Sequence, residues 1–351
     1  MKSLHRIAFA SLATSVVGLS LLPIGQSSGV AAGPPDPKSP QTKDTRVNPR
    51  ADPRADPRAD PRADPRADIV ARVGLEEVDR VSEAHWEALR ARRIYFAHQS
   101  VGSNMMRGLA EILRARPAIA LSTRRLSNSA EKAPSDTDAV FAEPGLVHGP
   151  AGPNGDPRAK FEAFERFVTG PRGEGIDIAF VKLCYADLDA STNVQGLIER
   201  YTAMVERIKR ARPTVRVLHV TVPLKAADQG AKGAVKRLVG NGTGPANAVR
   251  GRYNDLLRAR FPASQIIDIA AVESRSLDGS PATSTVAGVA WPALAAEYTN
   301  DGGHLNEVGQ VVVARALLLK LAENAEVEKF GRNGSGTEVR DPARKGARSG
   351  T

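Results

Sequence analysis

The most informative part of the chain is the segment Arg93-Ile-Tyr-Phe-Ala-His-Gln-Ser-Val-Gly102. Its first six residues contain the apolar run Ile94-Tyr-Phe-Ala97 and are typical of a buried β-strand. After the turn, Met105, Leu109 and Ile112 recur at the spacing of one helix face. A strand, a short turn and an amphipathic helix form the first unit of an α/β fold. We therefore expect Ser100 to lie in the turn at the carboxyl end of this strand.

The remaining pattern predicts a three-layer α/β/α fold with a flavodoxin-like, five-stranded parallel sheet. Residues 119–123, 176–183, 215–222 and 265–269 are the other predicted strands, and helices are predicted around Phe161 to Val168 and over 192–210, 246–260 and 305–321. In the 192–210 helix, Thr192 and Gln195 have the spacing of a capping box. In such sheets, reactive groups collect at the carboxyl ends of the strands.

The N-terminal segment has the pattern of a cleavable secretory signal. Residues 1–32 begin with Lys2 and Arg6, continue through an apolar run, and end on the small residues 29–32. The alternative is an uncleaved membrane anchor, although Ser and Thr interrupt the run, which is short for a full span. We expect a secreted, periplasmic or cell-envelope protein.

Two flanking segments lack the residues needed for a core. Residues 33–68 are rich in Pro and hold four copies of Ala-Asp-Pro-Arg, which predicts an extended, disordered linker. Residues 330–351 are rich in Gly, Arg and Ser and are predicted to be a disordered basic tail. One globular domain is therefore expected over 69–329.

Composition narrows the partners without naming one. The formal charge of +10 favours acidic polymers, including anionic polymers of the cell envelope. Nucleic acid is disfavoured by the export signal and by the lack of basic residues interleaved with aromatic ones. Cys184 is the single cysteine, so no intramolecular disulfide can form. We interpret it as a buried small residue rather than a nucleophile, and the sequence does not reveal the oligomeric state.

Two polar groups have the chemistry of an activated nucleophile. A serine in a sharp turn at a helix start has backbone N–H groups nearby, although Ser100 could instead be a helix N-cap. Asp301 and His304, separated by two glycines, can approach one another, so the carboxylate can fix the imidazole tautomer. A metal pair is the rival interpretation, but no further His or Cys has metal-ligand spacing.

These segments resemble the SGNH or GDSL hydrolase superfamily. Residues 98–102 stand where the family has Gly-Asp-Ser, and Asp301-Gly-Gly-His304 matches the Asp-x-x-His of its last block. The resemblance extends over about residues 94–321. It implies a serine esterase with Ser100 as nucleophile, His304 as base and Asp301 as the orienting acid. It also implies that the chemistry needs neither a metal nor an organic cofactor.

The family's middle blocks, which supply oxyanion donors, match less well. Gly155, with Asn154 beside it, is the counterpart of the glycine block. The N–H groups of Gly155 and Ser100 are predicted to form the oxyanion hole together. Ala186 replaces the asparagine of Gly-x-Asn-Asp, so one donor is missing. Asn154, Asn104 and the Tyr185 hydroxyl are the candidates to replace it.

Other residues are predicted to bind substrate or to pack. His98, Tyr185 and Asn104 are the candidate substrate-binding residues, although a packed strand-end histidine is an equal interpretation of His98. His148 is interpreted as loop material, His219 as a core histidine, and Trp291 and Tyr298 as aromatic packing below the Asp301 loop.

The sequence thus predicts hydrolysis of a small-molecule or carbohydrate ester, with a carbohydrate O-acetyl group as one candidate. The alternative is a catalytically impaired module that binds a glycan or another cell-envelope polymer.

Overall fold

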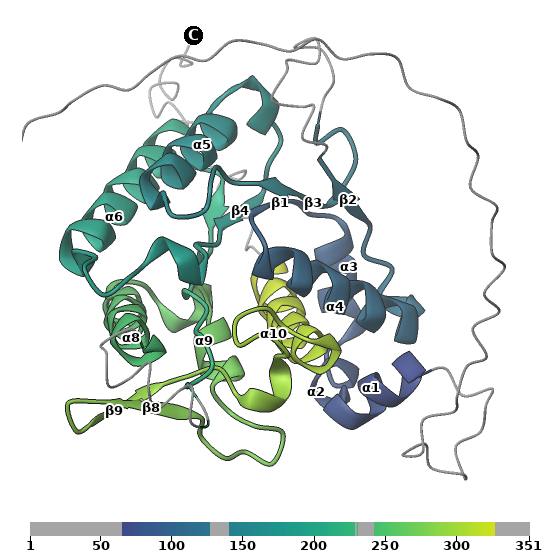
Figure 1. The fold of residues 1–351 in the computed structure, drawn as a ribbon. Helices are drawn as coiled ribbons and strands as arrows, with labels where there is room; N and C mark the ends of the chain where they lie inside the picture. The colour runs from purple at the N-terminus through teal and green to yellow at the C-terminus, as the bar shows by residue number, and fades with distance from the viewer. Residues whose placement is uncertain (1–64, 127–139, 229, 231–241, 327–351) are drawn as a thin grey trace, which may run out of the picture. The chain divides into compact units, whose positions relative to one another are not determined.

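A computed structural model describes residues 65–126, 140–228, 230 and 242–326 (Figure 1). The predicted signal, most of the predicted linker and the predicted basic tail lie outside these residues. The first helix, α1, begins at Pro65, so residues 65–68, predicted as the end of the linker, are helical.

The described helices and strands alternate along most of the chain. Their bounds are α1 Pro65–Val73, α2 Glu76–Asp79, α3 Glu83–Arg90, β1 Arg93–His98, α4 Val101–Ala115, β2 Thr123–Arg125, β3 Gly145–Pro150, α5 Pro157–Thr169, β4 Ile178–Val181, α6 Val194–Ala211, β5 Arg216–Val217, β6 His219–Val220, α8 Thr243–Arg260, β7 Ile266–Ile267, α9 Ile269–Glu273, β8 Thr283–Val286, β9 Val289–Pro292 and α10 Glu307–Ala325.

The central sheet has five parallel strands in the order β2-β3-β1-β4-β5. The strand β6 begins two residues after β5 ends and pairs in parallel with β7. Between them, the Leu218 N–H donates to the Ala179 carbonyl of β4 at 3.0 Å, so the small β6-β7 sheet continues the central one. The chain leaves β1 toward one edge and returns through β4 on its other side, which makes β1 the point where the strand order reverses.

The predicted fold class is confirmed, but the strands of the sheet differ from those expected. The predicted strand 119–123 is wrong, because the strand β2 begins only at Thr123 and its three residues are exposed. The strand β3 was not predicted, and His148 lies in it rather than in a loop. The predicted capping box is also wrong, because Asn193 caps α6 by accepting the Gly196 N–H at 2.9 Å.

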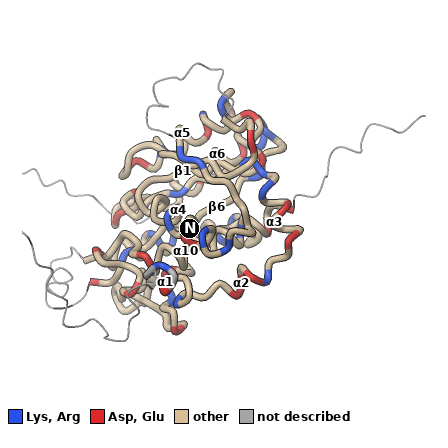
Figure 2. The backbone as a smooth tube through the Cα atoms, turned by 90° about the vertical axis from the view of Figure 1, so that its right-hand side faces the viewer, with Lys and Arg blue, Asp and Glu red and all other residues tan. Residues whose placement is uncertain are grey.

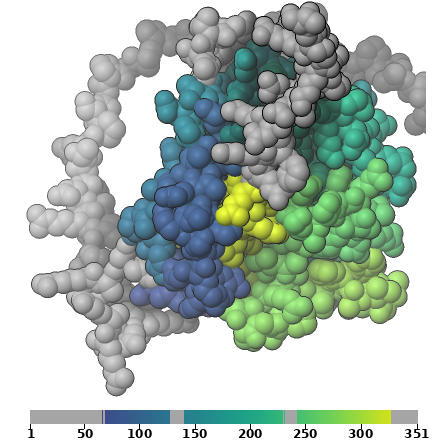
Figure 3. All heavy atoms as spheres, turned by 180° about the vertical axis from the view of Figure 1, so that it is seen from behind, coloured from purple at the N-terminus to yellow at the C-terminus, as the bar shows by residue number. Residues whose placement is uncertain are grey.

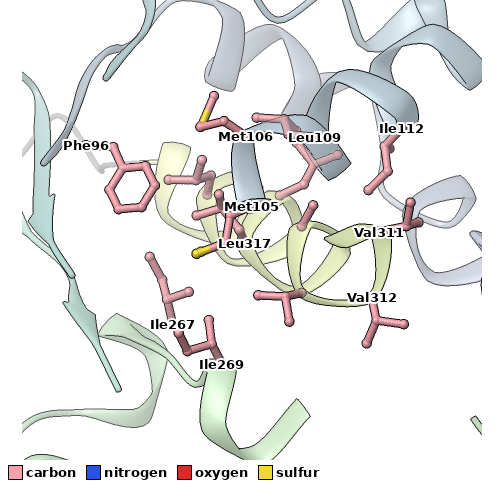
Figure 4. Packing of buried hydrophobic residues seen from close by; sticks show 14 of the residues in the cluster. Phe96, Met105, Met106, Leu109, Ile112, Ile267, Ile269, Val311, Val312 and Leu317 are labelled. Atoms are coloured by element: carbon pink, nitrogen blue, oxygen red, sulfur yellow. The ribbon is translucent and has the colours of Figure 1, made fainter. Parts of the chain in front are cut away.

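Two helical layers cover the sheet, and alternate residues of β1 point into each. Ile94 and Phe96 pack with α1, α3, α4 and α10, whereas Tyr95 and Ala97 pack with α5, α6 and α8. Figure 4 shows the first layer, in which Met105 and Leu109 of α4 pack with residues of α10. Seen from behind in Figure 3, α10 lies between the N-terminal helices and the green second half of the chain.

The helices α4 and α10 pack backbone against backbone. A Cβ atom added to Gly108 of α4 would lie 2.0 Å from the Gln310 carbonyl oxygen of α10. Only glycine permits this approach, because any larger residue would force the two helices apart. The contact matters for the site, because each helix adjoins one of the polar segments singled out in the sequence.

Charged residues of both signs are spread along the described part of the chain (Figure 2). In the view of Figure 2, acidic and basic residues are interleaved along the helices. Within the described ranges, none of the helices combines the length and the apolar character needed to cross a bilayer.

His219 lies in the core, as predicted. Its side chain is buried, its Nδ1 lies 2.9 Å from the Tyr201 hydroxyl, and its ring stacks on Phe261. Desolvation by burial, with a smaller contribution from Lys209, lowers the pKa of His219 to about 3. The folded protein therefore holds this imidazole neutral at pH values where an unfolded chain would protonate it.

We expect the protein to lose stability as the pH falls below about 6.5, the ordinary histidine pKa. In this range the unfolded chain binds a proton at His219 that the folded chain does not, so acid favours unfolding. Between pH 7 and pH 5, His219 should contribute a loss of about 2 kcal/mol in unfolding free energy. Urea unfolding at both pH values should show a correspondingly smaller loss for His219→Gln. An equal loss in both proteins would contradict the assignment.

Candidate active site

Three neighbouring strands end at one edge of the sheet. His98 of β1 is paired with Pro150 of β3, and Ala97 is paired with Val181 of β4. The loops that follow these strands are therefore adjacent, as expected where the strand order reverses. The loop before α10 lies against the segment that follows β6, because the Ala226 N–H donates to the Gly302 carbonyl at 3.0 Å.

Ser100 occupies a strained backbone position in the turn between β1 and α4. Its φ is 39° and its ψ is −97°, which is unusual for a residue with a side chain. It stands at the N-cap position of α4, yet its side chain accepts no cap hydrogen bond. The N-cap interpretation therefore does not account for its hydroxyl. The turn is tight, since a Cβ atom on Gly102 would lie 2.3 Å from the Cβ atom of His98.

The structure brings Ser100, His304 and Asp301 together in a single chain of hydrogen bonds. The Ser100 Oγ lies 2.7 Å from the His304 Nε2, and the His304 Nδ1 lies 2.6 Å from the Asp301 Oδ2. Ser100 and His304 are 204 residues apart in the sequence. This is the geometry in which a carboxylate orients an imidazole that can take a proton from a serine.

Asp301 is held ionised by its own loop. Its Oδ1 accepts the backbone N–H groups of Gly303 at 2.9 Å and His304 at 2.8 Å. Burial alone would raise the pKa of Asp301, but these bonds and the one from the His304 ring hold it well below its usual value. An ionised carboxylate on Nδ1 fixes the tautomer of His304 that leaves Nε2 free to accept a proton.

Asn104 lies below this group rather than at the surface. Its side chain is only 3% exposed, and its Oδ1 faces the Leu305 N–H at 3.4 Å. The predicted substrate-binding role of Asn104 is therefore not supported, because its side chain is buried and its Oδ1 accepts from the Leu305 N–H. Its contact instead ties the first turn of α4 to the loop that carries His304.

His98 packs in the strand end, which agrees with the second interpretation of this residue. It is 4% exposed, and its Nε2 lies 2.9 Å from the Nδ1 of His148. Desolvation by burial lowers the pKa of His98 to about 3 and that of His148 to about 4, so both rings are neutral near pH 7. Burial therefore leaves His98 little surface for the substrate contact predicted from the sequence.

The predicted oxyanion role of Gly155 does not agree with the structure. Its single backbone N–H donates to the Asp187 Oδ1 at 2.8 Å, so it is not directed at Ser100. Asn154 is exposed, and its Oδ1 accepts from the Lys160 Nζ at 2.9 Å, which leaves its amide nitrogen as a donor. No acceptor for the Ser100 N–H lies among the described residues. Of Ser100, Gly155 and Asn154, the three residues predicted to form the oxyanion hole, Ser100 and Asn154 thus keep a donor available.

A buried ion pair between Lys160 of α5 and Asp187, which follows β4, lies between the loops that follow β3 and β4. The Lys160 Nζ lies 2.6 Å from the Asp187 Oδ2, and both side chains are fully buried. The same Oδ2 atom accepts the Cys184 N–H at 2.6 Å. Asp187 therefore fixes Gly155 on one loop and Cys184 on the other, and both loops flank Ser100.

Sequence reasoning missed this ion pair, although one signal for it was present. Lys160, Phe164 and Val168 are spaced by four residues, so a charged residue shares the apolar face of α5. A charge on a buried helix face requires a partner. Asp187 stands at the last position of the segment compared with Gly-x-Asn-Asp, directly after Ala186.

Gln99 adds a second link between neighbouring loops. Its Nε2 donates to the Gly152 carbonyl at 2.6 Å, which holds the loop carrying Asn154 against the residue before Ser100. Within the described part of the chain, no three His, Cys, Asp or Glu side chains are grouped so that they could hold a metal ion.

Tyr185, which the sequence predicts to bind substrate, lies beside His304. Its hydroxyl is 3.4 Å from the His304 Nε2, and the two rings meet edge to face with centroids 5.8 Å apart. Gly303 packs on the phenol, because a Cβ atom there would lie 3.0 Å from its Cζ. The Lys225 Nζ lies 5.6 Å from the ring centroid. These contacts hold the hydroxyl at the edge of the Ser100–His304 pair.

Comparison with known proteins finds similarity at the level of solved structures alone. The chain matches no protein-family model and no curated protein. It is similar to a lipolytic protein of the G-D-S-L family from Desulfitobacterium hafniense, with a TM-score of 0.38 and 8% identity over 65% of this chain and 98% of that one. A GDSL-like lipase from Parabacteroides merdae gives a TM-score of 0.33 and 13% identity over 67% and 97%. A protein from Streptococcus pneumonia, named provisionally as a platelet activating factor, gives 0.33 and 14% over 63% and 92%.

Proposed function

We propose that this chain is a serine hydrolase of the SGNH type that cleaves an ester. The observation that carries the proposal is the hydrogen-bond chain from Ser100 through His304 to Asp301, with distances of 2.7 and 2.6 Å. The strained backbone of Ser100 and its unused capping capacity support the same role.

In the proposed reaction the Ser100 Oγ attacks the ester carbonyl carbon while the His304 Nε2 takes the hydroxyl proton. The intermediate collapses when the bond to the alcohol oxygen breaks, and His304 returns the proton to that oxygen. Water then attacks the acyl-serine by the same route and releases the acid. Asp301 stays ionised and holds the imidazole throughout.

The negative charge on the carbonyl oxygen needs preorganised donors. The Ser100 N–H at the start of α4 is one, and we assign the amide nitrogen of Asn154 as the second. Because the Gly155 N–H is bound to Asp187 and Ala186 has no side-chain donor, this set differs from the one that the family resemblance implies.

We further propose that the enzyme acts outside the cytoplasm. The secretory pattern of residues 1–32 and the Pro-rich repeats that follow support export and tethering. Candidate substrates are then esters of the cell envelope, including carbohydrate O-acetyl groups, and the net charge of +10 favours association with anionic envelope polymers.

A second candidate is a binding module that has lost catalysis. The engagement of the Gly155 N–H and the loss of the asparagine at position 186 favour it, since one missing oxyanion donor typically costs about 10²–10³ in turnover. This candidate predicts retained glycan binding without an active nucleophile.

A fluorophosphonate probe separates the two candidates. Wild-type protein, expressed with its own N-terminus, should gain one phosphonyl group on the peptide that contains Ser100, and Ser100→Ala should gain none. The intact mass of the secreted product also reports whether the N-terminal segment has been removed.

Ser103→Ala is the matched control, because Ser103 lies on the first turn of α4 and outside the triad. It should label and hydrolyse an aryl acetate like the wild type. Equal labelling of Ser100→Ala would discard the nucleophile, and glycan binding by an unlabelled wild type would favour the binding module.

A further inference from the structure

Tyr185 is the polar side chain near the triad that the proposed mechanism leaves without a role. In the resting state the Nδ1 of His304 donates to Asp301, so its Nε2 has one lone pair to offer. The Ser100 hydroxyl, 2.7 Å from Nε2, donates its hydrogen to this lone pair. The Tyr185 hydroxyl lies farther from Nε2, at 3.4 Å. The phenol therefore stands beside the reacting atoms with a proton that is weakly engaged.

This balance changes once Ser100 has attacked. The Nε2 of His304 then carries the proton and becomes a donor, so it can no longer accept from Tyr185. The oxygen toward which the Nε2–H points is that of the departing alcohol. A hydroxyl 3.4 Å from Nε2 is within reach of the same oxygen.

The phenol is prepared for this role by its surroundings. Its ring is held between Gly303, His304 and Lys225, and its backbone carbonyl accepts from the Arg250 Nε at 2.9 Å. Desolvation by burial, together with the charge of Asp301, raises the pKa of Tyr185. The hydroxyl therefore stays protonated near neutral pH and acts as a donor.

We propose that the Tyr185 hydroxyl donates a hydrogen bond to the leaving-group oxygen as the ester bond breaks. This inference rests on the proposed serine hydrolase function. The electron pair of the broken carbon–oxygen bond goes to that oxygen, the His304 Nε2 supplies its proton, and Tyr185 keeps its own. The enzyme is thereby suited to alkyl esters, such as acetylated sugar alcohols, whose alkoxides leave poorly without help.

The test compares Tyr185→Phe with the wild type on two acetates that share an acyl group. One releases 4-nitrophenol, which leaves readily, and the other releases a simple alkyl alcohol. The quantity measured is kcat/KM, which reports the acylation step. Loss of a hydrogen bond to a charged oxygen should lower kcat/KM by about 10- to 100-fold on the alkyl ester and by less than about 3-fold on the aryl ester.

The aryl ester serves as the internal control for folding, because a disordered site would lose both activities. A loss of similar size on both esters, or on neither, would overturn the leaving-group role while leaving the hydrolase intact. If wild-type protein hydrolyses neither ester and takes up no phosphonate, the serine hydrolase itself is wrong.

Discussion

Replacing His304 with glutamine is expected to lower kcat/KM for an aryl acetate by roughly 10²–10⁴-fold, which is the usual contribution of a positioned general base. Glutamine keeps a polar side chain of similar length but cannot take the Ser100 proton. The side chain of His304 is 46% exposed, so the fold should tolerate the change. Steady-state kinetics together with thermal unfolding would check both statements.

His85 provides the matched control for this substitution. It lies on α3, outside the site, and its Nδ1 is 2.6 Å from the Ser82 hydroxyl. His85→Gln should retain wild-type turnover. Equal activity in His304→Gln and the wild type would remove the imidazole from the mechanism, even if Ser100 still reacted with a phosphonate.

Replacing Lys160 with methionine is expected to lower the free energy of unfolding by about 3–5 kcal/mol. Methionine fills much of the same volume but leaves the Asp187 carboxylate buried without its cation. The two remaining bonds to Asp187, from the N–H groups of Gly155 and Cys184, cannot replace the lost charge. Urea unfolding at neutral pH measures the effect.

Lys209→Met is the comparison for Lys160→Met. Lys209 also forms an ion pair, with Glu206 at 3.4 Å, but both side chains are about half exposed, at 49% and 50%. Its loss should change the unfolding free energy by less than about 1 kcal/mol. If both variants were destabilised equally, the buried pair would not hold the two loops as described.

The sequence predicts an element well where one residue pattern determines it. The apolar run of β1 and the helical spacing of Met105, Leu109 and Ile112 left little choice, and the bounds Arg93–His98 are those predicted. The strand β2 has no such pattern, because its residues at the sheet edge are exposed and include Arg124 and Arg125. The strand β3 begins at Gly145 and ends at Pro150, which are residues typical of a turn.

In the site, too, contacts between residues close in sequence could be predicted, whereas contacts that depend on tertiary packing could not. Asp301 and His304 are close in sequence, and the two glycines between them let the loop fold back on itself, so their contact could be anticipated. The partner of the Gly155 N–H could not, because it depends on where Asp187 of another loop lies after folding. The burial of His98 and Asn104 is likewise set by tertiary packing, since neither residue type is by preference internal.

The contact between Gly108 and the Gln310 carbonyl has a mechanical consequence. Ser100 immediately precedes α4, and His304 and Asp301 sit together just before α10, so each half of the triad is attached to one rigid rod. The distance between the Ser100 hydroxyl and the His304 imidazole then depends largely on the position of α4 relative to α10. Because position 108 has no side chain, the main-chain atoms of the two helices set their relative position. A backbone contact of this kind cannot adjust by changing a side-chain rotamer.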